Sequence, residues 1–252
     1  MILGAQLYTL RDFTKTLESF SQTLARMAEM GYKTVQVSAT VEYEPDWLNH
    51  KLKENGLRCV ATHFNTDKIK SSPSEAVEFH NRFGCKNIGI GSVPGGLKSD
   101  EDYNRFVGGF LPAARSIAAS GSSLVFHNHA PEFAKSGDGR LYIERMAEDF
   151  LPSELGFILD TYWVQFAGGD PSYWIKRLSG RVNCVHLKDM EYTDKQQITS
   201  VGAGNMNFEA IISACEEAGS EYLLVEQDEC FGRDPFECLK SSYEYLRSLG
   251  LS

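Results

Sequence analysis

The stretch GFILDTYWVQFAGGDPSYWIKRLSGRVNCVHLKDM, residues 156–190, contains one complete strand–helix–strand unit. Residues 156–159 and 183–186 are short apolar runs of the kind found in buried strands. Between them Asp170 stands directly before Pro171, and an acid followed by proline is typical of the first residues of a helix. Because a helix joins the two strands, the stretch predicts a parallel pair and an α/β fold.

The same unit recurs on both sides of this stretch. A second acid–proline pair, Asp234 and Pro235, and a helical face made by Leu17, Phe20, Leu24 and Met27 belong to two other units. Eight units in 252 residues favour one closed (β/α)₈ TIM barrel over residues 1–252, since an open doubly wound sheet needs about six. The predicted strands are 3–8, 34–37, 58–61, 87–90, 123–126, 156–159, 183–186 and 222–225.

Composition restricts the partners and the cellular location. The chain has 25 Lys and Arg against 34 Asp and Glu, a net charge of −9, and no basic segment that would bind nucleic acid. It has no apolar run long enough to span a membrane and no signal-peptide pattern at its start. The six cysteines are scattered without a CxxC pair, which is typical of reduced thiols. We therefore expect a soluble cytoplasmic protein.

Polar residues that bear chemistry gather at the predicted strand ends, where TIM barrels carry their active sites. Four of the six histidines, 63, 127, 129 and 186, fall there, whereas His50 and His80 fall in helices. Asp160 follows the sixth strand and Glu226 the eighth. Such a ring of imidazoles and carboxylates predicts a catalytic site at this rim of the barrel.

Asp160, His186 and Glu226 come from three successive strands, and these are residue types that bind Mn²⁺, Zn²⁺, Co²⁺ or Fe²⁺. A fourth ligand is expected after the fifth strand, where three residues compete: His127, His129 and Glu132. Each residue also has a simpler interpretation. The aspartate suits a helix cap, the histidine a hydrogen-bonded core position, and Glu226 a solvated acidic loop.

The remaining candidates would contact a substrate. Lys188, two residues beyond His186, suits an oxyanion or phosphate, or else a surface pair with Asp189. Trp163 is expected either to stack on a sugar ring or to pack in the core. Polar residues at or near other strand ends suit hydroxyl recognition; these are Gln6, Gln36 and Asn65. The HNH string at 127–129 lacks the ββα context of nucleases.

Several motifs together resemble one superfamily over essentially the whole chain. They are GYKTVQVS (31–38), VFHNHAPEF (125–133), ILDTYWVQFAGGDP (158–171), RVNCVHLKDM (181–190), GAGNMNFEAII (202–212) and LLVEQD (223–228). In this combination and order, the chain resembles the sugar phosphate isomerase/epimerase superfamily of xylose isomerase-like TIM barrels. The resemblance implies one divalent metal, of unspecified identity (Mg²⁺ included), held by one residue from each of strands 5 to 8.

Asp160, His186 and Glu226 match the last three of these metal positions. Many relatives carry a glutamate at the first, where this chain has His127, so either His127 replaces it or Glu132 reaches back from the loop; we favour His127. Gln36 likewise stands where relatives often have a glutamate.

The resemblance further implies an enzyme that transfers a proton next to the carbonyl of a keto-sugar or sugar derivative. An isomerase or epimerase is the first expectation, and an inosose dehydratase-type lyase is the alternative. Glu132 and Glu226 are candidate bases, His63 and His129 would move protons on oxygen, and Lys188 would act as an acid or bind an oxyanion. An apurinic endonuclease-like or a non-catalytic sugar-binding barrel ranks lower. The expected partner is a small carbohydrate, without nucleic acid or membrane, and a homo-oligomer is left open.

Overall fold

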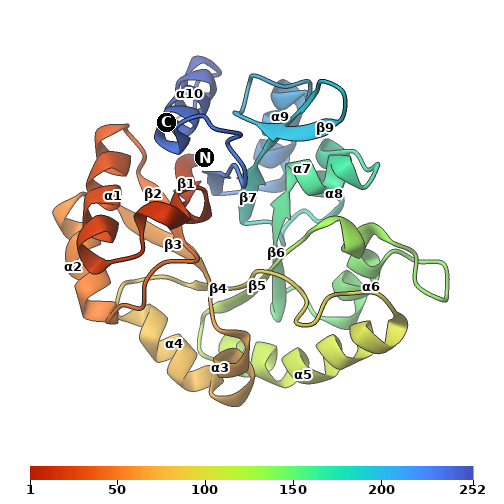
Figure 1. The fold of residues 1–252 in the computed structure, drawn as a ribbon. Helices are drawn as coiled ribbons and strands as arrows, with labels where there is room; N and C mark the ends of the chain where they lie inside the picture. The colour runs from red at the N-terminus through yellow and green to blue at the C-terminus, as the bar shows by residue number, and fades with distance from the viewer. Residues whose placement is uncertain (252) are drawn as a thin grey trace.

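The computed structural model describes residues 1–251, in which eight parallel strands close into a barrel surrounded by helices (Figure 1). The barrel closes where β1 pairs with β10, with Ile2 opposite Tyr222. The fold prediction is therefore confirmed. The barrel strands are β1 Ile2–Gln6, β2 Thr34–Val37, β3 Arg58–His63, β4 Asn87–Ile90, β5 Ser123–His127, β6 Leu155–Asp160, β7 Cys184–Leu187 and β10 Tyr222–Val225.

Helices connect the strands and cover the outside of the barrel. They are α1 Leu17–Glu29, α2 Pro45–Glu54, α3 Thr66–Ser71, α4 Pro73–Asn81, α5 Asp100–Ala119, α6 Tyr142–Asp149, α7 Thr161–Phe166, α8 Pro171–Arg177, α9 Phe208–Ala218 and α10 Pro235–Ser248. Two 3₁₀ segments, η1 Leu7–Phe13 and η2 Ala130–Phe133, follow β1 and β5. The predicted first strand was too long, because residues 7 and 8 belong to η1.

Both predicted acid–proline helix starts are confirmed. The Asp170 carboxylate accepts hydrogen bonds from the backbone N–H groups of Ser172 and Tyr173, and Asp234 caps α10 in the same way. The predicted apolar face of α1 is buried from Phe20 onward, whereas Leu17, at the first turn, is 42% exposed.

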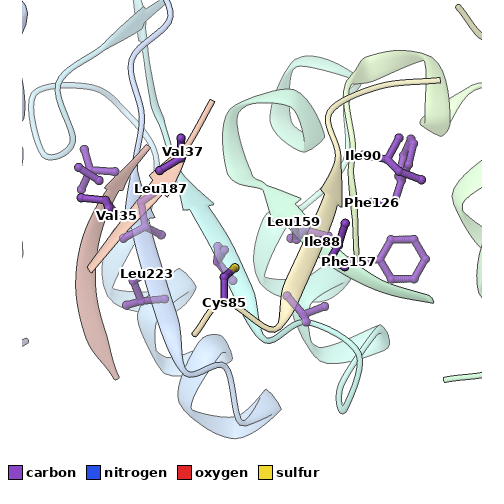
Figure 2. Close-up of a cluster of buried hydrophobic side chains, with 14 of the residues drawn as sticks. Val35, Val37, Cys85, Ile88, Ile90, Phe126, Phe157, Leu159, Leu187 and Leu223 are labelled. Carbon is purple, nitrogen blue, oxygen red and sulfur yellow. The ribbon is translucent and has the colours of Figure 1, made fainter. Parts of the chain in front are cut away.

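Alternation along the strands separates two buried layers. One set of side chains packs between the barrel and its helices, as Leu159, Leu187 and Leu223 do in Figure 2. The intervening residues, among them Ile158 and Leu224, form a smaller cluster with residues of other strands. Because successive strand residues point to opposite faces, that smaller cluster fills the inside of the barrel.

A second, two-stranded sheet was not predicted. It is the antiparallel hairpin of β8 (Asp189–Tyr192) and β9 (Gln196–Thr199), which is inserted after β7. All six cysteines are free thiols, and five of them are buried. None of the helices in residues 1–251 is long and apolar enough to cross a membrane.

Candidate metal centre

Four buried side chains meet at the carboxyl end of the barrel, one from each of β5, β6 and β7 and one directly after β10. They are His127, Asp160, His186 and Glu226, and each offers a ligand atom within 4.8 Å of the others. Their position follows from the strand alternation. Two residues before each of them is an apolar residue of the inner layer, so the same face of the strand carries the polar residue to the barrel axis.

The two histidine rings are fixed by hydrogen bonds on their outer nitrogens. His127 donates from Nδ1 to the carbonyl oxygen of Gly91 at 3.1 Å, and His186 donates from Nε2 to Oε1 of Gln36 at 2.7 Å. These assignments follow from the acceptors, since a carbonyl and an amide oxygen have no proton to give. In neutral rings, both inner nitrogens therefore carry lone pairs. A histidine held in this way by an outer acceptor is the usual arrangement at metal sites.

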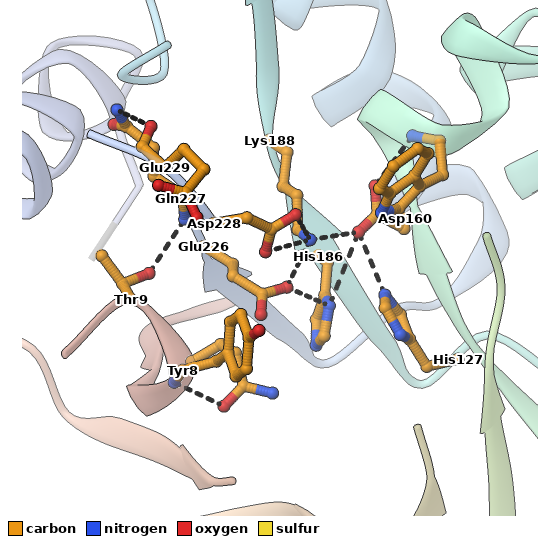
Figure 3. Close-up of polar contacts among 12 residues, drawn as sticks. Tyr8, Thr9, His127, Asp160, His186, Lys188, Glu226, Gln227, Asp228 and Glu229 are labelled. Carbon is orange, nitrogen blue, oxygen red and sulfur yellow. Dashed lines mark hydrogen bonds and ion pairs between the residues drawn. The ribbon is translucent and has the colours of Figure 1, made fainter. Parts of the chain in front are cut away.

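Both inner nitrogens face carboxylate oxygens. Nε2 of His127 lies 3.0 Å from Oδ2 of Asp160, and Nδ1 of His186 lies 2.9 Å from Oε2 of Glu226 (Figure 3). Neither of the last two atoms has a hydrogen bond of good geometry, although Oε2 of Glu226 also lies 2.7 Å from the ammonium of Lys188. Lone pairs directed at one another repel unless a proton or a cation lies between them. At His186, Glu226 and Asp160 outweigh burial and raise the pKa, so a proton is favoured there when no cation is bound. The donor set, two imidazoles and two carboxylates, is one that a divalent transition metal accepts.

The two oxygens of Asp160 have separate roles. Oδ1 accepts the backbone N–H of Trp163 at 3.0 Å and so caps α7, while Oδ2 points to the centre. The backbone N–H of Asp160 donates to the side chain of Asn128 at 2.9 Å, which ties the end of β6 to the end of β5. The sequence offered the helix cap and the metal ligand as alternatives, and one carboxylate has the geometry for both.

Lys188 is buried beside the same carboxylates, with 1% exposure. Its ammonium lies 3.0 Å from Oδ2 of Asp160, 2.7 Å from Oε2 of Glu226 and 2.9 Å from Asp228. The simpler interpretation of the sequence, in which Lys188 is a surface residue paired with Asp189, is therefore wrong. The ammonium partly neutralises three carboxylates that would otherwise repel one another in a site shielded from water.

Local charge determines the protonation of the cluster. Burial alone raises the pKa of Glu226, but Lys188 and His186 outweigh it and hold that pKa well below its ordinary value. Burial also raises the pKa of Asp160, but the charge of Lys188 is the main effect that opposes it, and the pKa lies well below its ordinary value. Burial and then His127 lower the pKa of His129 to about 3, and burial also lowers the pKa of His63 well below its ordinary value. Both of these imidazoles are therefore neutral at neutral pH.

A hollow of about 380 Å³ opens above the cluster. Four of the predicted residues line it besides the candidate ligands His127 and Glu226, namely His63, His129, Trp163 and Lys188. His127 and His129 lie on the same side of the chain as expected, with ring centroids 4.6 Å apart. The Trp163 ring lies 5.3 Å from His129, and its Nε1 is buried without a partner.

Glu132 lies outside this cluster. It is buried, its carboxylate accepts the backbone N–H of His129 at 2.7 Å, and burial raises its pKa to about 7. Of the two strand 5 alternatives, the geometry brings His127 rather than Glu132 to the centre. Glu132 instead fixes the turn that follows His129.

The three predicted amides are placed differently. Gln36 orients His186, and Gln6 accepts the backbone N–H of Tyr8; both are buried and each has an unpartnered Nε2. Asn65 is exposed, caps α3 and lines a neighbouring hollow.

Tyr8 and Asp228 also line the hollow above the cluster, and neither was predicted from the sequence. Asp228 stands two residues after Glu226, and this spacing could have indicated that both side chains point to the same side of the chain.

The family model of the xylose isomerase-like TIM barrel matches residues 24–249. The chain belongs to this family. Inosose dehydratases are among the relatives of this xylose isomerase-like barrel. The inosose dehydratase of Geobacillus thermodenitrificans is 23% identical to this chain, and the alignment covers 91% of this chain and 89% of the dehydratase. The inosose dehydratase of Geobacillus kaustophilus is 24% identical to this chain. That alignment covers 68% of this chain and 62% of the dehydratase.

A solved sugar phosphate isomerase/epimerase from Parabacteroides distasonis has the same fold. Its TM-score is 0.83 at 22% identity, covering 98% of this chain and 93% of that structure. The predicted family resemblance is thus confirmed.

Proposed function

We propose that this protein is a divalent-metal-dependent enzyme that moves a proton on the carbon next to a carbonyl of a keto-sugar or sugar derivative. The observation that carries the proposal is the convergence of two buried imidazole nitrogens on buried carboxylate oxygens, 3.0 and 2.9 Å away. A cation held by His127, Asp160, His186 and Glu226 would neutralise the two carboxylates and take the place of a proton on His186, whose pKa Glu226 and Asp160 raise against the effect of burial. When bound, it would polarise the substrate carbonyl and stabilise the enediolate charge.

The chain's own residues supply the remaining functions. The hollow above the cluster is lined by aromatic and polar side chains that bind a small polyol and restrict water. Lys188 keeps its proton, because Asp160, Glu226 and Asp228 outweigh burial and raise its pKa, so it presents a positive charge to a substrate oxygen in the hollow. Neutral His63 and His129 are available to accept a proton and return it. Glu226 remains a candidate base for the carbon-bound proton.

Two outcomes of the same proton removal are open. Return of the proton to carbon gives an isomer or epimer, as the name of the Parabacteroides protein suggests. Loss of a neighbouring hydroxyl gives a dehydratase, the activity named for relatives that cover 91% of this chain. Both share the first step. The acidic chain, with a net charge of −9, favours a small carbohydrate over nucleic acid as the partner.

The test is exchange of substrate hydrogen with solvent deuterium, followed by NMR. The protein is incubated in D₂O with Mn²⁺ and a panel of ketoses and a keto-inositol. We expect deuterium at the carbon next to the carbonyl of at least one compound, and its loss in Glu226→Gln. An aldose or an epimeric ketose identifies an isomerase or epimerase, and loss of water identifies a dehydratase. Absence of exchange and of product across the panel would contradict the proposal.

A further inference from the structure

A second hollow of about 370 Å³ adjoins the one above the metal centre. The two share Ser38 and His63 as a common wall. A third hollow of about 320 Å³ continues outward and shares Tyr43, Lys68 and Phe79 with the second. Because neighbouring hollows share these residues, they lie in a row from Glu226 and Lys188 to the loops after β2 and β3, and we call this row the groove. The space at this site therefore extends well beyond what surrounds the four candidate ligands.

We propose that this groove binds a second ring, so that the substrate is a keto-sugar that carries a second, glycosidically linked sugar ring rather than a free monosaccharide. The inference rests on the proposed function and defines its substrate class. The hollow over the centre is near the lower end of the roughly 300–1,000 Å³ found for small-molecule sites. The reacting ring would lie there, and the linked ring would lie between Ser38 and Lys68.

The lining of the second hollow suits an uncharged sugar. Three half-buried aromatic side chains lie along it, Tyr43, Phe64 and Phe79, with Phe79 5.3 Å from Phe64 and 5.8 Å from Tyr43. Aromatic rings pack against the C–H face of a sugar, while its hydroxyls need polar partners at the edge. Lys68, an exposed lysine that lines this hollow, offers such a partner.

His63 connects the two hollows. Its Nδ1 lies 3.2 Å from the hydroxyl of Ser38, and its Nε2 is buried without a partner. A buried nitrogen without a partner is costly, so a ligand atom that bonds it would be stabilised. In a glycoside, the atoms between the two rings lie at this boundary. The adjoining Ala39 has a left-handed backbone with φ of 54°, a strained conformation of the kind that concentrates at binding sites.

Charge disfavours the main alternative, a phosphorylated sugar. In the second hollow the single ammonium of Lys68 is opposed by Glu42. The outer hollow adds three more glutamates, at positions 44, 75 and 78, against one further cation, Arg82, which is paired with Asp46. A phosphate dianion would meet a net negative surface there, whereas a neutral ring would not.

The test compares binding of ketoses that differ only in what they carry. Fructose, its 6-phosphate, and the glycosylated ketoses turanose, lactulose and isomaltulose are titrated by calorimetry into Mn²⁺-supplemented protein. At least one glycosylated ketose is expected to bind roughly tenfold tighter than fructose. Thr40→Trp, which places an indole in the second hollow, should abolish that advantage without changing fructose binding, whereas Thr40→Val should keep it.

Equal affinity for fructose and all three glycosides, tightest binding of the phosphate, or no binding of any probe would each overturn the groove assignment. Failure here is distinguishable from failure of the proposed function. Binding is read without turnover, and solvent exchange on a one-ring ketose would stand even if the groove bound nothing.

Discussion

Lys188 shares two carboxylate partners with the expected cation, so the two positive charges compete. Its ammonium lies 2.7 Å from Glu226 and 3.0 Å from Asp160. We predict that Lys188→Met binds Mn²⁺ at least about tenfold more tightly, because removing the ammonium lowers electrostatic competition. Without metal, the variant should lose about 3–5 kcal/mol of unfolding free energy. Calorimetry and denaturant unfolding measure both effects.

The matched control is Lys68→Met, which removes an exposed lysine outside the cluster and should leave Mn²⁺ affinity unchanged. Added metal should restore much of the stability that Lys188→Met loses, since a cation then neutralises the same oxygens. Unchanged or weaker Mn²⁺ affinity in Lys188→Met would show that the ammonium supports the metal instead of competing with it.

His80 makes the stability depend on pH independently of the centre. It is fully buried between the hydroxyl of Thr62, at 2.8 Å, and the carbonyl of Ala76, at 2.6 Å, and burial lowers its pKa from 6.5 to about 4. The unfolded chain therefore binds a proton that the folded chain does not. The contribution of neutral His80 to the free energy of unfolding is complete above pH 6.5 and is lost as the pH falls toward 4.

We expect His80→Gln to lose less stability on acidification than the unmodified protein. Between pH 6.5 and 5 the difference should reach about 1.6 kcal/mol, since the slope approaches about 1.4 kcal/mol per pH unit only once the unfolded histidine is fully protonated. Denaturant unfolding at several pH values measures it, with the exposed His50→Gln as control. Parallel pH profiles for His80→Gln and the unmodified chain would contradict this assignment.

Single residues were predictable from the sequence where strand periodicity fixed their direction. His127, Asp160 and His186 each lie two positions after an inward-facing residue of a strand. Because strand side chains alternate between the two faces, the sequence predicted that these three would converge. Glu132 could not be placed, because it lies in a 3₁₀ turn with no such period. The burial of Lys188 could not be predicted, because it depends on three carboxylates brought together from other strand ends.

At the scale of elements, one carboxylate organises the loop between β9 and α9. Asp189 accepts backbone N–H bonds from Gly202 at 2.9 Å, Gly204 at 3.0 Å and also from Met190 and Met206. Gly204 passes so close to this carboxylate that a Cβ would collide with it. The sequence motifs HLKD and GAGNMNF are thus two halves of one hydrogen-bonded unit.

Asp189→Ala should therefore lower the free energy of unfolding by about 3 kcal/mol, because several backbone donors lose a charged acceptor. Hydrogen exchange should accelerate at residues 200–206 more than in the barrel strands. Asp194→Ala removes an equal charge from the exposed tip of the β8–β9 hairpin and should change stability by less than about 0.5 kcal/mol. Equal effects of the two substitutions would count against the role of Asp189.

The barrel strands were predictable as elements, and three of them, β2, β4 and β10, have the predicted bounds. The β8–β9 hairpin was not, for a physical reason. Its strands DMEY and QQIT are largely polar, and its turn, Thr193–Asp194–Lys195, has no Asn-Gly or similar pair. The hairpin instead continues from Asp189, which is held by contacts distant in sequence.

At the scale of the whole molecule, the barrel divides its chemistry between two arcs. β5, β6, β7 and β10 bring the four candidate ligands, while β1 to β3 bring neutral Gln6, Gln36 and His63 and the groove beside them. The barrel count followed from the eight apolar runs. The groove did not, since loops after β2 and β3 have no periodicity that reports a hollow.

The central claim is that four strand-end side chains bind one divalent metal ion. Its most direct test is elemental analysis of protein purified without chelators, together with Mn²⁺, Zn²⁺ and Co²⁺ titrations of folded variants. We predict about one ion per chain in the unmodified protein and in Glu132→Gln, and at least roughly 100-fold weaker binding in His127→Ala, since even outer partners cost 10–100-fold. An unmodified protein that binds none of these ions, or a His127→Ala variant that retains full affinity, would contradict the account.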